Sequence, residues 1–312
     1  MTISIFGSIN LDLVARAARL PMPGETILGR TFATVPGGKG ANQAVAVARL
    51  GVEAALVGRV GADGFGRELL ACLQAARVDT AGVWVDETVG SGVAAIAVDD
   101  RGENQIVVVP GANGQVNNTD VDRLKAQLSN ATTLLLQCEI PLPAIQAAAQ
   151  AAQMAGVSVI LDPAPAPDDF PSVLYGLVDI ITPNETEASQ LVGFPVRDPE
   201  TAAQAANSLR QQGAKTAIVK LGSQGAFCAA ENEAFFRPAF LVQAVDTVAA
   251  GDAFNAGLAV ALANGLSLRQ AVTWGAAAGA LAVTQAGAQP SLPDRKTFEA
   301  FLRSHGMEIN DR

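Results

Sequence analysis

One short segment of the sequence combines small residues with a carboxylate. Residues 246–254 are Asp-Thr-Val-Ala-Ala-Gly-Asp-Ala-Phe, and a long apolar helical pattern follows. Small residues such as Ala249, Ala250 and Gly251 leave main-chain N–H groups exposed at a helix start, where they attract the negative charge of a transferring phosphate. Asp252 can take the proton of an attacking alcohol there. Composition alone favours a simpler role for Asp252, that of a helix N-cap.

A second segment, residues 37–42, is Gly-Gly-Lys-Gly-Ala-Asn. Its glycines, Gly38 and Gly40 among them, let the main chain approach a small ligand closely, and Asn42 supplies both a donor and an acceptor. The segment is not a P-loop, because Ala33 stands where the Walker pattern needs its first Gly and Gly40 where it needs Ser or Thr. A plain turn that leads from a loop into a helix fits this segment equally well.

Polar side chains also follow two predicted strands. Asn10 and Asp12 come after the first strand, and Glu139 comes after a later apolar strand. The ends of strands in α/β sheets hold ligands. Together with Asn42, these carboxylates and amides suit a ligand rich in hydroxyl groups, although each residue taken singly is more often a cap or turn residue.

Two further turns are candidates for nucleotide binding. Asn184 and Glu187 lie one helical turn apart after a short strand, a spacing that can orient a hydrated Mg²⁺ or phosphate oxygens. A helix-capping pair explains this spacing equally well. Residues 220–225, Lys-Leu-Gly-Ser-Gln-Gly, close another strand with a Gly-rich turn that could line a nucleotide, although such a turn is more often a simple hairpin.

Composition excludes several other chemistries. The net charge is −9, and Lys and Arg are scattered along the chain without a run, which argues against a nucleic-acid partner. The single histidine, His305, lies in the tail, which argues against His-based hydrolysis and His-ligated metal catalysis. Carboxylates, main-chain amides, Lys or a loosely held metal must then do the chemistry. That set favours phosphoryl transfer.

Cysteine usage and the apolar stretches predict a cytoplasmic protein without a membrane partner. Cys72, Cys138 and Cys228 are odd in number, far apart and set among apolar residues, as reduced thiols are. The first residues are typical of a strand rather than a signal peptide. Residues 270–293 carry no charge, but they are mostly Ala and Gly with Thr, Gln and Pro, which indicates a buried helix and loop rather than a membrane span.

Short β-forming runs alternate with Ala-rich amphipathic segments along the chain. Strands are predicted at 2–6, 54–60, 133–137, 157–161, 180–181 and 216–221, and helices at 43–50, 66–76, 142–155, 200–212, 252–264 and 268–283. This order predicts one α/β domain over residues 1–312, with a doubly wound, mostly parallel sheet flanked by helices. Residues 11–35 and 92–109 break the alternation. They are predicted to be antiparallel strands of a small β-sheet lid over the ligand, although surface hairpins without a gating role are the alternative.

In type and order these motifs resemble the ribokinase-like (PfkB) carbohydrate kinases, and within that family the ribokinase subgroup. The resemblance runs from Gly7 to about Pro293, and residues 37–44 and 246–254 look like the two signatures of the family. Ala249 stands where the wider family usually has Gly, a change that the ribokinase subgroup tolerates. Ala276 stands where relatives often place a larger polar residue against adenine, which leaves the base preference open.

The resemblance assigns roles to individual positions. It implies that Asp252 is the base and that Ala249, Ala250 and Gly251 form an anion hole. It implies that the sugar contacts are Asn10, Asp12, Gly38, Lys39, Gly40, Asn42 and Glu139. It implies an ATP site lined by Asn184, Lys220, Leu221, Gly222, Ser223, Gln224, Gly225, Gly251 and Ala276. It implies a monovalent cation, usually K⁺, beside Asp246, Val248, Ala282, Gln285, Gly287 and Ser291, with Mg²⁺ held indirectly by Asn184 and Glu187.

The activity implied by the resemblance is ATP-dependent phosphorylation of D-ribose at its 5-hydroxyl to ribose 5-phosphate, by a homodimer paired through the lid. A kinase for deoxyribose, fructose or a nucleoside is the alternative within the same class. Asn10 favours a sugar with a 2-hydroxyl, because a site built to bond that group rejects the deoxy analogue. A non-catalytic sugar-binding protein is the alternative from another class, and the presence of Asp252 argues against it because a sensor needs no base.

Overall fold

The apolar β-forming runs are strands of one nine-stranded sheet in the computed structural model, which describes residues 1–307. The strand order is β13-β12-β11-β10-β9-β8-β1-β4-β5, and the seven strands from β11 to β5 are parallel. The bounds are β1 Thr2–Phe6, β4 Glu53–Gly61, β5 Asp79–Asp86, β8 Ala131–Gln137, β9 Ser158–Asp162, β10 Ile180–Ile181, β11 Thr216–Lys220, β12 Gly225–Ala229 and β13 Ala234–Pro238.

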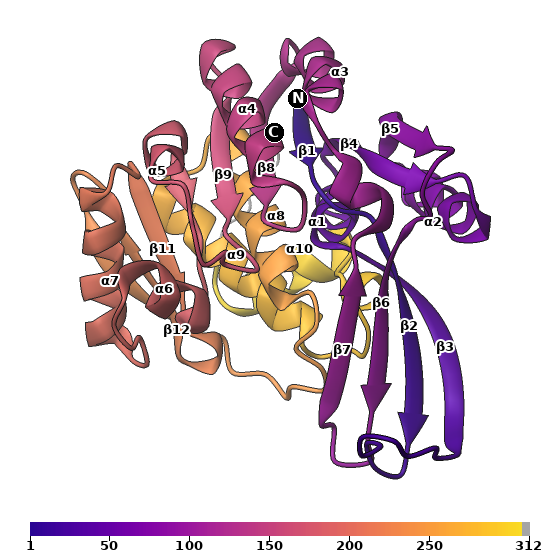
Figure 1. Ribbon diagram of the computed structural model, residues 1–312. Coiled ribbons are helices and arrows are strands. Elements are labelled where there is room, and N and C mark those ends of the chain that lie inside the picture. The colour runs from indigo at the N-terminus through magenta and orange to yellow at the C-terminus, as the bar shows by residue number, and fades with distance from the viewer. Residues whose placement is uncertain (308–312) are drawn as a thin grey trace.

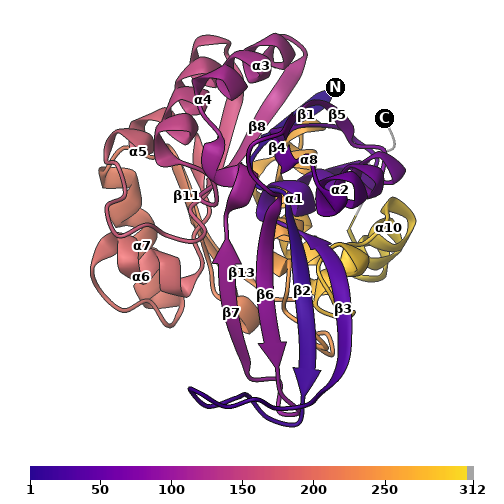
Figure 2. The same cartoon turned by 45° about the vertical axis from the view of Figure 1, so that its right-hand side comes forward.

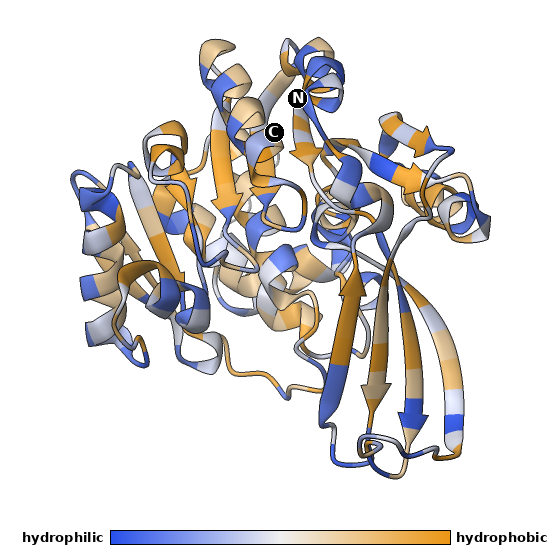
Figure 3. Ribbon diagram, viewed as in Figure 1, coloured by the Kyte–Doolittle hydropathy of each residue, from blue (hydrophilic) through white to orange (hydrophobic). Residues whose placement is uncertain are grey.

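Helices cover both faces of this sheet (Figure 1). Alternate residues of a strand point to opposite faces, so Leu135 of β8 joins one apolar core while Leu134 and Leu136 join the other. The first core contains α1 Lys39–Arg49, α2 Gly64–Ala75, α8 Ala250–Ala263, α9 Leu268–Ala282 and α10 Arg295–Ser304. The second contains α3 Asn118–Leu128, α4 Leu142–Met154, α5 Val173–Leu177, α6 Glu185–Val192 and α7 Pro199–Gln211. The orange central strands in Figure 3 reflect this burial on both faces.

The predicted fold class is confirmed, with differences at the edges. β5 and the antiparallel hairpin β12–β13 extend the sheet beyond the predicted strands. The predicted helix 43–50 begins earlier, at Lys39, because Gly38 takes the positive φ of 85° that starts it. A bilayer crossing would need a longer and more apolar helix than any that residues 1–307 form.

Four strands form a separate sheet with the order β3-β2-β6-β7. Their bounds are β2 Asn10–Ala17, β3 Gly29–Gly37, β6 Gly92–Val98 and β7 Asn104–Val109, close to the two predicted segments. The pairs β2–β3 and β6–β7 are antiparallel as predicted, but the central pair β2–β6 is parallel, because both strands leave the same edge of the large sheet. Figure 2 shows this small sheet standing clear of the helices that cover the large one.

The chain order defines where a ligand can enter. From β1 the chain builds β4 and β5 on one side, and then it builds β8 to β11 on the other. The loops after β1 and β8 therefore diverge, and the crevice at such a switch point is where open α/β sheets hold ligands. The small sheet projects beyond this carboxyl edge (Figure 1).

Candidate active site

Three chain segments meet at the switch point between β1 and β8. Ser8 Oγ donates to Glu139 Oε2 over 2.5 Å, and the Lys39 main-chain N–H donates to the same oxygen over 3.0 Å. The segments meet closely because Gly40 has no side chain: a Cβ there would lie 2.6 Å from the carbonyl carbon of Gly7. Gly40 thus allows two main-chain segments to approach each other, whereas the prediction from the sequence was an approach to a ligand.

Asn10 and Asp12 lie on the same face of β2, two residues apart. Asn10 is buried, and the pKa of Asp12 is raised to about 6, chiefly by burial and then by the nearby charge of Glu139. The structure therefore brings together the predicted sugar-contacting residues Asn10, Asp12 and Glu139. It surrounds them with the main chain of Gly38 and Gly40 at the start of α1.

Asp252 lies in the first turn of α8, buried but facing a cavity. Asn42 Nδ2 donates to its Oδ2 over 2.9 Å, and Gln43 Nε2 donates to its Oδ1 over 3.1 Å. Burial raises its pKa to about 6, with Asp162 adding to the rise, while Lys39 and the two amide donors oppose it. A carboxylate poised in this way is ionised at neutral pH and basic enough to accept a proton.

Gln43 and Asp162 lie beside Asp252, although neither was predicted to be a site residue. Gln43 Nε2 also donates to Asp162 Oδ2 over 3.3 Å, and Gln43 Oε1 accepts from Gln137 Nε2 over 2.7 Å. Lys220 Nζ pairs with Asp162 Oδ1 at 3.0 Å. Asp162 ends β9, so the rule that singled out Glu139, a polar residue at the end of an apolar strand, also applies to it.

The ammonium group of Lys39 lies among four carboxylates of this site. Burial lowers its pKa, but the charges of Asp252, Asp162, Glu139 and Glu187 outweigh burial, so the net pKa is above its usual value. Among residues 1–307, its side chain forms no ion pair within 4.0 Å. Lys39 is therefore a fixed positive charge that remains available to an anionic ligand.

A cavity of about 630 Å³ joins Asp252 to the predicted nucleotide residues. Its polar side is lined by Lys39, Asp162, Asn184, Glu187, Lys220 and Asp252, and Ala276 lies on its apolar side with Phe240, Val242, Ala280 and Val283. Gly222, Ser223 and Gly225 also line it. Leu221 and Gln224 do not: Leu221 is buried in an apolar core, and Gln224 Nε2 donates to the carbonyl of Arg197 over 2.8 Å.

The start of α8 is built to receive negative charge. Ala249, its N-cap, has a left-handed φ of 59° and provides no side-chain cap. Ala250 and Gly251 both line the cavity, and the Ala250 N–H donates to the carbonyl of Thr247 over 3.3 Å. A Cβ added at Gly251 would lie 3.3 Å from Lys220 Nζ, so the positive end of the helix and an ammonium group share one spot.

The Asn184–Glu187 pair forms a capping box at the start of α6. Glu187 N donates to Asn184 Oδ1 over 2.9 Å, and Asn184 N donates to Glu187 Oε2 over 2.8 Å. The capping interpretation of the spacing is confirmed, and both residues also line the cavity. Burial, with Asp162 adding to it, raises the pKa of Glu187. Among residues 1–307, no group of three or more acidic, His or Cys side chains could hold a metal by itself.

The residues predicted to hold a monovalent cation come from two segments, one just before α8 and one that begins at the last residue of α9. Asp246 accepts from Val248 N over 3.1 Å and from Gly287 N over 2.9 Å, and the main chain of Asp246 bonds to Val283 O. Gln285 N donates to the carbonyl of Ala282, and Ser291 Oγ donates to the carbonyl of Ala288. One carboxylate among several carbonyls is a donor set that suits a weakly charged, oxygen-ligated cation.

Comparison with known proteins assigns the family. Residues 2–295 match the model of the pfkB family carbohydrate kinases. The ribokinase of Haemophilus influenzae is 40% identical over 301 residues, which cover 96% of this chain and 98% of that protein. The deoxyribokinase of Salmonella typhi is 33% identical, covering 97% of this chain and 99% of that protein. The Arabidopsis thaliana ribokinase structure complexed with ribose and ATP has a TM-score of 0.89 at 36% identity, covering 96% and 98% of the two chains. This chain belongs to the pfkB family of carbohydrate kinases.

Proposed function

We propose that this carbohydrate kinase transfers the γ-phosphoryl group of ATP to the 5-hydroxyl of D-ribose. The observation that carries the proposal is the position of Asp252, whose carboxylate accepts from Asn42 and lines the large cavity, while Lys39 lies close enough to feel the charges of both Asp252 and Glu139. The relatives named ribokinase support ribose as the substrate, and the ribokinase complexed with ribose and ATP supports the nucleotide.

In the proposed reaction, the hydroxyl oxygen of the sugar forms a bond to the γ-phosphorus as the bond from that phosphorus to the β,γ-bridging oxygen breaks. Asp252 takes the hydroxyl proton, and ADP leaves with the bridging oxygen. The Gly251 amide, the positive end of α8 and the Lys220 ammonium stabilise the charge on the migrating group, and the Ala250 amide can join them by sharing the N–H that it now donates to Thr247 O. Asn42 and Gln43 hold the carboxylate of Asp252 in place by bonding one oxygen each.

The cavity offers complementary surfaces for the nucleotide. Ala276, Ala280, Val283 and Phe240 are an apolar wall for the base, and Gly222, Ser223 and Gly225 provide a turn without large side chains. Asn184 and Glu187 fit Mg²⁺ only through water, because their oxygens already accept hydrogen bonds from each other. When bound, Mg²⁺ would neutralise charge on the phosphates of ATP.

A panel of sugars tests the substrate assignment. We expect ADP release to be fastest with D-ribose and slower with 2-deoxy-D-ribose, D-fructose and nucleosides. The deoxyribokinase relative makes 2-deoxy-D-ribose the main competitor. Faster turnover of 2-deoxy-D-ribose than of D-ribose would replace the proposed substrate, and no turnover of any sugar would favour the binding-protein alternative.

The pH dependence should follow the ionisation of the base. Only the carboxylate form of Asp252 accepts a proton, and its pKa is about 6, so kcat/KM for the sugar should level off above pH 7 and fall as the pH drops through about 6. The Gln43→Leu variant loses a hydrogen bond that lowers this pKa, so its profile should shift to higher pH.

A second carboxyl group, Asp12, has a similarly raised pKa of about 6, so variants must separate the two. The Asp12→Asn variant should bind sugar more weakly but keep the inflection of the wild-type profile. If Asp12→Asn loses the inflection, or if the kcat/KM profile of Gln43→Leu does not shift, the pH dependence does not come from Asp252.

We expect K⁺ to activate the enzyme more than Na⁺ at equal ionic strength. A cation held by Asp246 and the neighbouring carbonyls would order the turn that leads into α8. Rates in the two chlorides, measured for the wild type and for Asp246→Asn, check this assignment. Equal wild-type rates in both salts would remove it.

The small sheet is proposed to be a lid that covers the sugar and pairs with a second copy of the chain. Its outer strands expose Phe32 at 66% and Val107 at 64%, and exposed apolar side chains on an uncovered sheet are typical of an interface. Sedimentation at micromolar concentration should give a dimer, and the monomer mass of 31.9 kDa would contradict the pairing. The cytoplasmic location stays a prediction.

A further inference from the structure

Asn113 lies outside every predicted motif, in the 3-10 segment Gly111–Gln115. Its side chain nevertheless contacts Asn10, one of the predicted sugar contacts. It is 1% exposed, and all of its polar atoms are engaged. Its Oδ1 accepts from Ile9 N over 2.9 Å, and its Nδ2 donates to Ile9 O over 3.0 Å and to Asn10 Oδ1 over 2.7 Å. Asn113 thus touches Asn10, and neither residue lines the large cavity that holds Asp252.

These contacts fix which end of the Asn10 amide is free. The Ile9 N–H can only donate, so the Asn113 atom that faces it is the oxygen. The other end of Asn113 is then its NH₂ group, which can only donate, so the Asn10 atom that faces it is also an oxygen. The NH₂ group of Asn10 remains, and it donates to no other group within residues 1–307.

Gly92 is required for this arrangement. It pairs with Asn10 across β2 and β6. A Cβ at Gly92 would lie 2.2 Å from Asn113 Nδ2 and 2.3 Å from Asn10 Oδ1. Real Cβ atoms do not make such contacts, so a larger residue at position 92 would force the two amides apart. The strand register and the missing side chain therefore both serve the Asn113–Asn10 hydrogen bond.

We infer that Asn113 is a positioning residue that holds the Asn10 amide with its NH₂ group toward the sugar. This inference rests on the proposed function. Asp12 and Glu139 accept hydrogen bonds when ionised, and each sugar hydroxyl has only one proton to donate. A hydroxyl that donates its hydrogen bond to a carboxylate has no second proton to donate. It can therefore bond to Asn10 only as an acceptor, so Asn10 must present its NH₂ group. Asn113 enforces that choice from outside the site.

The Asn113→Asp variant tests the inference with little change of shape. A carboxylate there can still accept from Ile9 N, but its second oxygen accepts rather than donates. The Asn10 amide must then turn its NH₂ group toward residue 113 and its oxygen toward the sugar. We expect KM for D-ribose to rise roughly tenfold or more while KM for ATP stays within about twofold, because the two lost donors, one toward Ile9 O and one toward the sugar, lie around Asn10 and not among the residues that line the cavity.

A double-mutant cycle separates positioning from general damage. With Asn10→Ala in place, Asn113→Asp should cause no further rise in KM for D-ribose, because the amide that it orients is gone. A full additional rise in that background, an equal rise in KM for ATP, or an unchanged KM for D-ribose in Asn113→Asp would each overturn the inference.

Gly92→Ala provides a second route if Asn113→Asp does not fold, because it disturbs the same hydrogen bond from the other strand. It should also raise KM for D-ribose and leave KM for ATP nearly unchanged, and an unchanged KM for D-ribose would overturn the inference. Gly114→Ala is the matched control in the same segment, since a Cβ there makes only an ordinary contact at 3.4 Å. The wild type is assayed first, and its failure to phosphorylate any pentose would reject the proposed function independently of these variants.

Discussion

The Asp252→Asn variant should bind D-ribose and ATP nearly as tightly as the wild type while its turnover falls about 10²- to 10⁴-fold. The side chains have the same shape, so Asn42 can still donate to an oxygen at position 252 and the start of α8 is kept. What is lost is the group that accepts the hydroxyl proton. Stopped-flow or steady-state ADP release measures the turnover, and calorimetric titration measures the binding of each substrate.

Asp122→Asn is a suitable control for this experiment. Asp122 is an exposed carboxylate on α3 that pairs with Lys125, so its substitution should leave turnover unchanged. An Asp252→Asn variant with more than about a tenth of wild-type turnover would remove Asp252 as the base, since a general base contributes more than that. A large loss of sugar binding instead would make Asp252 chiefly a binding residue.

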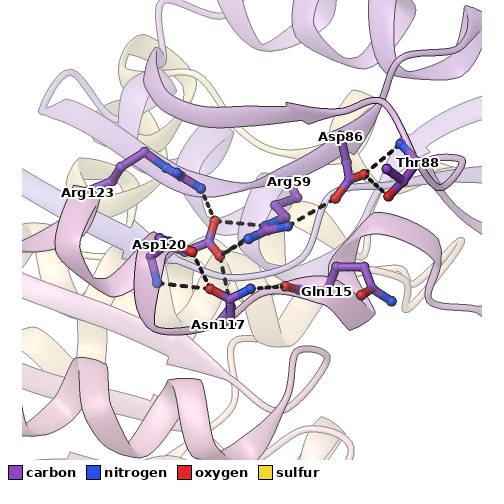
Figure 4. Close-up of polar contacts among 8 residues, drawn as sticks. Arg59, Asp86, Thr88, Gln115, Asn117, Asp120 and Arg123 are labelled. Atoms are coloured by element: carbon purple, nitrogen blue, oxygen red, sulfur yellow. Dashed lines mark hydrogen bonds and ion pairs between the residues drawn. The ribbon is translucent and has the colours of Figure 1, made fainter.

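The Arg59→Met variant should lose about 3–5 kcal/mol of unfolding free energy, the usual effect of leaving a buried charge unpaired. Arg59 of β4 lies between two buried carboxylates (Figure 4). Its Nη2 pairs with Asp120 Oδ2 at 2.8 Å, and its Nη1 pairs with Asp86 Oδ2 at 3.0 Å. Arg123 also bonds to Asp120, but Asp86 would keep only its bonds to Thr88. Urea denaturation monitored by circular dichroism measures the loss.

Two further variants make this measurement decisive. Lys125→Met removes an exposed ion pair on α3, the helix that carries Asp120, and should lower the unfolding free energy by less than about 0.5 kcal/mol. Adding Asp86→Asn to Arg59→Met removes the one carboxylate that is left without an ion pair and should recover part of the lost stability. An Arg59→Met variant within about 1 kcal/mol of the wild type would show that water or local rearrangement replaces the guanidinium group.

Part of the site was predictable because parallel strands bring their carboxyl ends to one edge. Asn10 and Glu139 follow buried strands, and that position made them candidate binding residues when they were taken together. Asp162 carries the same signal after Val159–Leu161, so a consistent use of the rule would have included it. The helical residue Gln43 carries no such signal, because the docking of α1 onto the sheet decides which of its side chains meet Asp252.

Contacts between distant segments limited the remaining predictions. Asn113 and Asn10 are 103 residues apart in sequence, and no local pattern links them. The small sheet was predicted from two stretches of β-forming residues, but the parallel pairing of β2 with β6 was not, because the alternation of side chains is the same in both orientations. Likewise, the turn at 220–225 was visible in the sequence, whereas the inward burial of Leu221 depends on the packed core.

The base of the small sheet has a mechanical consequence. Asn10 pairs with Gly37 on one side and with Gly92 on the other, so the row of residues at which the small sheet joins the rest of the molecule includes a proposed sugar contact. A tilt of the sheet must therefore change the grip of Asn10 on its substrate. In the proposed enzyme, the movement that opens the sheet would therefore also weaken the contact between Asn10 and the sugar.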